Sequence, residues 1–130
     1  MRLYALALLT LVACPEPPPA CTTVDATTCH ELYPPTWDNV YANTIAMSCG
    51  ADRSSCHSDA GKSGGITFAD KATSYTELLN GRVKPGNAGC SLLVVRIEGV
   101  GTDYQMPKGD PLGAPERCAI AKWVEMGGLP

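Results

Sequence analysis

The sequence Cys49-Gly-Ala-Asp-Arg-Ser-Ser-Cys56-His57 places two thiols and an imidazole close together in the chain. Six residues separate the two cysteines, and His57 follows the second one directly. A thioether comes later, in the pair Met106-Pro107. Thiols beside a histidine are typical of covalent haem attachment, of metal sites and of structural disulfides, so these residues are the first candidates for a functional site.

Haem attachment is the interpretation that uses all four side chains. The thiols of Cys49 and Cys56 would bond the vinyl groups, His57 would bind the iron on one face, and Met106 would bind it on the other. Haem motifs usually have two residues between the cysteines, so the longer segment here must bulge outwards as a loop. Closing that loop costs on the order of 1 kcal/mol, which does not forbid attachment.

The same residues leave other interpretations open. Cys49 and Cys56 could form a structural disulfide, and a zinc ion would need His30 and His57 as further ligands. An oxidising compartment works against free thiolates and therefore against zinc. His57 could also be an exposed loop histidine.

The methionines differ in their surroundings. Met47 and Met126 fall in predicted helices, where we expect them to pack in the core. Met106 could also be a packing residue, but it lies in a polar, glycine-rich loop that gives a lone apolar side chain little to pack against.

An amphipathic helix leads into the Cys-His stretch. Trp37, Val40, Tyr41, Thr44 and Ile45 follow the spacing of one helical face. Thr36 is a suitable N-cap for this helix. The helix is expected to continue to Cys49, so that the Cys-His stretch begins at its C-terminal end.

The rest of the chain predicts short helices joined by loops, and hence an all-α fold. A glycine-rich loop and a short extended piece at 66–68 come first. A capping-box pattern, Ser74-Tyr-Thr-Glu77, predicts a helix that stops at Asn80-Gly81. Residues 92–97 predict a helix capped by Asn87, although their β-branched residues would also suit a strand. A loop at 99–112 and a helix that starts at Pro115 and stops at Gly127-Gly128 follow.

The N-terminus predicts an exported lipoprotein. The apolar run 3–12 is too short to span a bilayer and suits a signal peptide. It ends in Leu11-Val12-Ala13-Cys14, which resembles a bacterial lipobox, so residues 1–13 would be removed and Cys14 would carry lipid. A plain signal peptide or a poor membrane anchor is the alternative. Residues 14–35, rich in proline and threonine, are expected to form a tether. The periplasmic face of the outer membrane is favoured as the anchoring site, with the cell surface as the alternative.

Seven cysteines in a small exported chain indicate an oxidising compartment. With Cys14 assigned to lipid, an even number remains. Sequence alone does not choose among the possible pairings. The expected pairs are Cys21 with Cys29, as a local loop, and Cys90 with Cys118, as a link between two helices.

The charge of the chain narrows the possible partners. Its formal net charge is −3, and it has no basic cluster. This balance argues against nucleic acid as a partner and against charge-driven adhesion to anionic lipid. We find no phosphate-binding loop and no motif of a catalytic serine.

The order of these features resembles a class I c-type cytochrome, and in particular the small cytochrome c-like domains of bacterial envelope lipoproteins with expanded Cys-x(n)-Cys-His motifs. The resemblance covers residues 37–130. It rests on the helix into Cys49…Cys56-His57, on Leu78-Leu79-Asn80-Gly81-Arg82-Val83-Lys84-Pro85-Gly86, on Ser91-Leu92-Leu93, on Gln105-Met106-Pro107-Lys-Gly-Asp-Pro-Leu112, and on Ala121-Lys-Trp123-Val-Glu-Met126-Gly127-Gly128.

The resemblance implies a cytochrome c-like domain at 36–130, stapled by disulfides, in which the first and last helices cross. It implies one haem c, bonded through Cys49 and Cys56, with His57 as the proximal and Met106 as the distal iron ligand. Such a protein carries single electrons between redox partner proteins by transient contact and is not an enzyme. The alternative is a haem-free, disulfide-stabilised lipoprotein that serves as a structural or interaction module.

Overall fold

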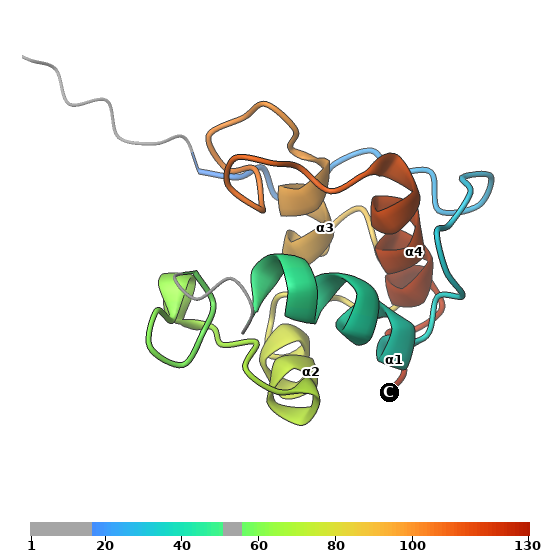
Figure 1. The fold of residues 1–130 in the computed structure, drawn as a ribbon. Coiled ribbons are helices and arrows are strands. Elements are labelled where there is room, and N and C mark those ends of the chain that lie inside the picture. Colours follow the sequence, from blue (N-terminus) through green and yellow to red (C-terminus); the bar gives the residue numbers. More distant parts are fainter. Residues whose placement is uncertain (1–16, 51–55) are drawn as a thin grey trace, which may run out of the picture.

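The computed structural model describes residues 17–50 and 56–130. This part of the chain is helical and contains no β-strand, which confirms the predicted fold class (Figure 1). The elements in chain order are α1 (Trp37–Val40), η1 (Tyr41–Cys49), η2 (Ser63–Gly65), α2 (Lys71–Leu79), α3 (Leu92–Glu98) and α4 (Ala114–Glu125). None of the helices in the two described ranges is long and apolar enough to cross a membrane.

The first helix begins where the sequence predicts. The Thr36 hydroxyl caps it by accepting a hydrogen bond from the amide of Asn39. The helix continues directly from α1 into η1, which has the wider π-helical turn and ends at Cys49. Its predicted inner face is buried at Trp37, Val40, Thr44 and Ile45.

Helix α2 starts earlier than the capping-box pattern predicts. Asp70 is the N-cap, because its carboxylate accepts from the amide of Thr73. Ser74, the predicted cap, lies inside the helix and is fully buried, with its hydroxyl donating to the backbone carbonyl of Asp70. The predicted stop is confirmed: Asn80 ends the helix, and Gly81 adopts a positive φ of 84°.

The segment from residue 92 is a helix, as predicted, and not a strand. Its N-cap is Ser91 and not Asn87. Asn87 stands in the preceding turn, where its side-chain oxygen accepts from the amide of Cys90. The buried Ser91 hydroxyl instead bonds the backbone of the 84–87 turn.

The first and last helices meet through aromatic rings. Pro115 lies in the first turn of α4, as predicted, and the helix ends just before Gly127. The rings of Trp37 and Trp123 stack with centroids 5.1 Å apart, and Tyr75 of α2 packs beside both. Figure 1 shows α1 and η1 running across the direction of α4.

Both expected disulfide pairs are wrong. Cys21 is bonded to Cys90, and Cys29 to Cys118. Each bridge therefore joins the N-terminal segment to the helical domain, where we expected one bridge within that segment and one between α3 and α4. Short sequence separation suggested the local pair, but backbone contacts along the segment favour the distant partners.

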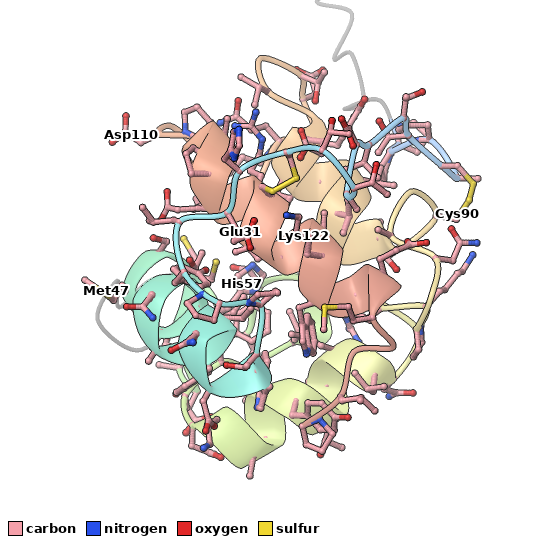
Figure 2. All side chains as sticks on the ribbon, turned by 90° about the vertical axis from the view of Figure 1, so that its right-hand side faces the viewer. Glu31, Met47, His57, Cys90, Asp110 and Lys122 are labelled. Atoms are coloured by element: carbon pink, nitrogen blue, oxygen red, sulfur yellow. A yellow bond between two sulfur atoms is a disulfide. The ribbon has the colours of Figure 1, made fainter. Side chains whose placement is uncertain are left out.

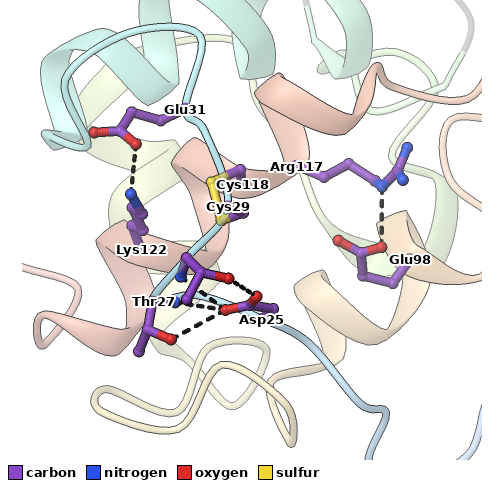
Figure 3. Close-up of a disulfide and its surroundings, with 9 residues drawn as sticks. Asp25, Thr27, Cys29, Glu31, Glu98, Arg117, Cys118 and Lys122 are labelled. Carbon is purple, nitrogen blue, oxygen red and sulfur yellow. Dashed lines mark hydrogen bonds and ion pairs between the residues drawn. A yellow bond between two sulfur atoms is a disulfide. The ribbon is translucent and has the colours of Figure 1, made fainter.

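Residues 20–35, which we call the N-terminal strap, lie along the helical domain. The amide of Thr22 donates to the carbonyl of Gly89 at 2.7 Å, and that of Leu32 to the carbonyl of Pro115 at 3.0 Å. Glu31 forms an ion pair with Lys122 of α4 at 2.5 Å, close to the Cys29–Cys118 bridge (Figure 3). The described part of the expected tether is thus held against α3 and α4.

Candidate functional site

The predicted site residues lie on three segments. Cys49 is the last residue of η1, Cys56 and His57 precede the loop that leads to the extended residues 66–68, and Met106 lies in the loop between α3 and α4. The predicted outward bulge of the segment between the two cysteines lies mostly outside the described residues. Cys14, the predicted lipid site, lies outside them as well.

Gly50 allows the end of η1 to approach the extended segment. A Cβ atom at this position would lie 2.7 Å from the backbone oxygen of Phe68 and 3.3 Å from that of Ile45. Backbone atoms cannot move aside as the tip of a side chain can, so a larger residue would push Cys49 away from Phe68. Gly50 thus fixes how closely the first thiol approaches the segment that holds His57.

Phe68 holds His57 in two ways. The Phe68 amide donates to the His57 carbonyl at 2.7 Å. The imidazole packs against the Phe68 ring, with centroids 5.1 Å apart and a tilt of 59°. The backbone and the side chain of His57 are therefore both fixed by the same buried aromatic residue, which is 4 % exposed.

The surroundings of His57 favour a neutral ring. Burial lowers the pKa of the imidazole, and the nearby charges of Arg96 and Arg82 lower it further. Hydrogen bonding to the backbone of Ile66 and Ser63 acts in the opposite direction and offsets part of this effect. At neutral pH, one ring nitrogen of His57 therefore has a lone pair available.

One nitrogen of the His57 ring lacks a hydrogen-bond partner among the described residues. This atom, Nδ1, is buried. Buried polar atoms are normally satisfied, so this imidazole nitrogen suits a group that binds a ligand.

The two thiols differ from the other described cysteines. Cys49 and Cys56 are not disulfide-bonded, whereas the other four cysteines of the described ranges are. Burial raises the pKa of Cys49 to about 12, with smaller contributions from Cys56 and Glu116. Cys49 is thus a protonated thiol at neutral pH, close enough to Cys56 for their charges to interact.

The zinc alternative finds no support in the described residues. In the ranges 17–50 and 56–130, no three His, Cys, Asp or Glu side chains are grouped so that they could hold a metal ion. His30, which zinc would need, is exposed on the N-terminal strap beside the bridged Cys29.

The backbone of Met106 is held by Arg96 of α3. The amide of Met106 donates to the backbone carbonyl of Arg96 at 3.0 Å, and the guanidinium of Arg96 acts electrostatically on His57. The Met106 side chain is half-buried. The loop that carries Met106 is thus attached to the last turn of α3.

The expectation that Met47 and Met126 pack in the core is wrong. Their exposed fractions are 56 % and 67 %. Figure 2 shows Met47 at the periphery of the molecule and His57 within it. Both methionines were assigned to the core because they fall in predicted helices. Met47 lies in the last turn of η1 and Met126 at the C-cap of α4, and neither side chain is covered by the core.

Three residues at the site were missed as functional candidates. Phe68 was expected only as part of the extended piece at 66–68, Arg96 only as part of the helix at 92–97, and Gln105 only as a neighbour of Met106. A buried aromatic residue after the glycine-rich loop was a weak signal for the first. A lone amide next to the candidate ligand was a stronger signal for Gln105, the one glutamine in the sequence.

Comparison of the chain with protein-family models, with curated proteins and with solved structures gave no match. The function is therefore argued from the site alone.

Proposed function

We propose that the protein is a single-electron carrier that holds one c-type haem covalently at the cell envelope. One observation carries this proposal. Cys49 and Cys56 keep their thiols where the other described cysteines are bridged, and Cys56 immediately precedes an imidazole whose Nδ1 is buried without a partner in the described part of the chain.

The chemistry of His57 suits an iron ligand. Metal-binding histidines commonly have one ring nitrogen on the metal and the other held by a backbone carbonyl or a carboxylate. In His57, Nδ1 is buried without a hydrogen-bond partner among the described residues, and hydrogen bonding to the backbone of Ile66 and Ser63 also acts on the ring. Burial and the two nearby arginines keep the ring neutral, which iron binding requires.

Met106 is the residue that we propose for the opposite face of the haem. A thioether opposite an imidazole favours reduced iron and raises the reduction potential. The bound haem would supply the one-electron chemistry, while the chain holds it, limits water access and presents it to partners.

The remaining parts of the proposal concern place and partners. Lipid on Cys14 would anchor the protein, with the outer membrane favoured, and contact with redox partner proteins would be transient. The acidic surface, with a formal net charge of −3 for the chain, favours a basic redox partner.

The test is to express the full chain in a bacterium that matures c-type cytochromes, and to purify the exported protein. We expect a red protein whose Soret absorbance stays with the polypeptide after acid-acetone extraction, and whose mass is increased by one haem. His57→Ala should remove iron ligation, and Cys49→Ser with Cys56→Ser should remove covalent attachment. His30→Ala is the matched control, because His30 also follows a cysteine but that cysteine is bridged to Cys118.

A haem-free interaction module is the second candidate, and one observation favours it. Cys56 is among the causes that raise the pKa of Cys49, so the two thiols lie near each other and could be oxidised to a third bridge. A colourless protein whose peptide map shows Cys49 bonded to Cys56 would establish this module and exclude the electron carrier.

A further inference from the structure

The loop that carries Met106 has no helix or strand of its own. It runs from Gly99 to Leu112, with positive φ values of 81° at Gly101 and 91° at Gly109. Such a loop keeps one shape only if side chains hold it, because few backbone hydrogen bonds cross it. The position of the Met106 sulfur therefore depends on what holds the loop together.

One buried side chain makes three hydrogen bonds across this loop. The Oε1 atom of Gln105 accepts from the amide of Gly101 at 2.7 Å. Its Nε2 atom donates to the carbonyl of Pro107 at 2.9 Å and to that of Gly109 at 3.3 Å. Gln105 is 8 % exposed, so these bonds are shielded from water.

The three bonds lie on both sides of Met106. Gln105, the residue before Met106, joins Gly101 at the start of the loop to Pro107 and Gly109 after Met106. The amide of Met106 itself is bonded to the carbonyl of Arg96. The planar amide is the group that fits, because it offers two donors and an acceptor at one end of the side chain. A carboxylate of the same shape would lack the donors and would face two carbonyl oxygens.

We propose that Gln105 is a positioning residue that holds the Met106 thioether in place for iron. This inference deepens the proposed function and rests on it for the role of the sulfur. The clamp itself, formed by Gln105 with Gly101, Pro107 and Gly109, does not depend on haem.

The clamp is tested first on the protein as purified, with or without haem. Selective ¹⁵N labelling of glutamine side chains gives one amide pair, because the chain has one glutamine. We expect this pair to exchange with solvent at least about tenfold more slowly than exposed amides. Exchange of the glutamine pair at the rate of a free side-chain amide would overturn the clamp.

Two substitutions then test positioning. Gln105→Leu removes all three bonds, and Gln105→Glu keeps the shape but loses both donors. In haem-loaded protein we expect both variants to lose the weak near-infrared band that a methionine sulfur gives with ferric haem, to lower the reduction potential, and to let carbon monoxide bind the ferrous form. Lys108→Ala is the control, since Lys108 also bonds across this loop, to the carbonyl of Asp103, but from an exposed position.

The outcomes separate the two proposals. Colourless wild-type protein with a protected glutamine amide would sink the electron-carrier function and the ligand role of Met106 while leaving the clamp established. Red protein in which Gln105→Leu and Gln105→Glu keep the near-infrared band, the potential and resistance to carbon monoxide would sink the positioning role alone. If either variant fails to fold, the other variant and the exchange of the wild-type amide still decide.

Discussion

The indole of Trp37 stacks on that of Trp123 at a centroid distance of 5.1 Å, with 29° between the ring planes. The first ring begins the helix that ends at Cys49, and the second lies in the helix that the Cys29–Cys118 bridge ties to the N-terminal strap. The indole nitrogen of Trp123 also donates to the carbonyl of Leu129 at 2.8 Å, which fastens the C-terminus to the same centre.

Truncation of either ring should destabilise the whole domain. Trp37→Ala and Trp123→Ala remove side chains that are 3 % and 2 % exposed, so each should lower the free energy of unfolding by about 3–5 kcal/mol. Denaturant unfolding followed by circular dichroism measures this loss. Trp123→Phe is the control, because it keeps one aromatic ring and loses the pyrrole part of the indole with its bond to Leu129; an equal loss in both Trp123 variants would contradict the packing explanation.

The disulfide connectivity can be checked by peptide mapping without reduction. Cleavage before Asp25 separates Cys21 from Cys29, and trypsin separates Cys90 from Cys118. We expect one cross-linked peptide for each of the pairs Cys21–Cys90 and Cys29–Cys118. A peptide that links Cys21 to Cys29 would refute the connectivity.

Loss of either bridge should be costly, because each closes a long loop. Cys29→Ala with Cys118→Ala opens a bridge across a sequence separation of 89 residues, and we expect a loss of about 2–5 kcal/mol in unfolding free energy. Cys21→Ala with Cys90→Ala should cost a similar amount. Wild-type stability in both double variants would show that the N-terminal strap does not support the domain.

A methyl group at Gly50 should disturb the approach between η1 and Phe68. Gly50→Ala places a Cβ atom 2.7 Å from a backbone oxygen, so we expect a loss of about 1–3 kcal/mol in unfolding free energy and reduced haem content in a maturing host. Gly64→Ala is a matched control in the neighbouring loop for packing alone: a Cβ atom there meets nothing within 4 Å, although its φ of 67° adds backbone strain. Haem content should fall in the first variant and not in the second.

The buried thiol makes the haem-free protein sensitive to alkaline pH. With a pKa of about 12 in the folded protein, against an ordinary value of 9.0, Cys49 keeps its proton in a range where the unfolded chain loses it. The stabilisation is therefore complete below pH 9 and is lost as the pH rises towards 12. At pH 8, the thiolate fraction of Cys49 should be about a thousandfold smaller than that of an ordinary thiol, so iodoacetamide should label Cys49 very slowly. Rapid labelling of Cys49 in folded protein would contradict its burial.

Sequence patterns were sufficient where a local interaction decides the structure. The Thr36 cap, the buried face that includes Val40 and Ile45, and the stop at Asn80-Gly81 follow from neighbours within a few residues, and the structure confirms them. The helix at 92–98 needed a choice between helix and strand, and the capped short helices around it pointed the right way.

One error was local, and the others concern contacts between segments that are distant in the sequence or within a loop. Ser74 matched a capping pattern, but Asp70 offers a carboxylate one turn earlier, and Ser74 is buried. The bonding of Cys21 to Cys90 and of Cys29 to Cys118 depends on contacts of the N-terminal strap with Gly89 and Pro115. The periodicity of the sequence does not predict these contacts. The three bonds of Gln105 likewise depend on how a loop closes on itself.

The two disulfides interleave in the sequence, and this connectivity affects how they form during synthesis of the chain. Synthesis proceeds from the N-terminus, so Cys21 and Cys29 emerge together long before Cys90 and Cys118, their partners. If oxidation begins at once, Cys21 can bond to Cys29 first. This non-native disulfide must then be exchanged for the native pairs once α4 has been synthesised. Correct maturation of this protein thus requires either delayed oxidation or thiol–disulfide exchange, which an isomerase would accelerate.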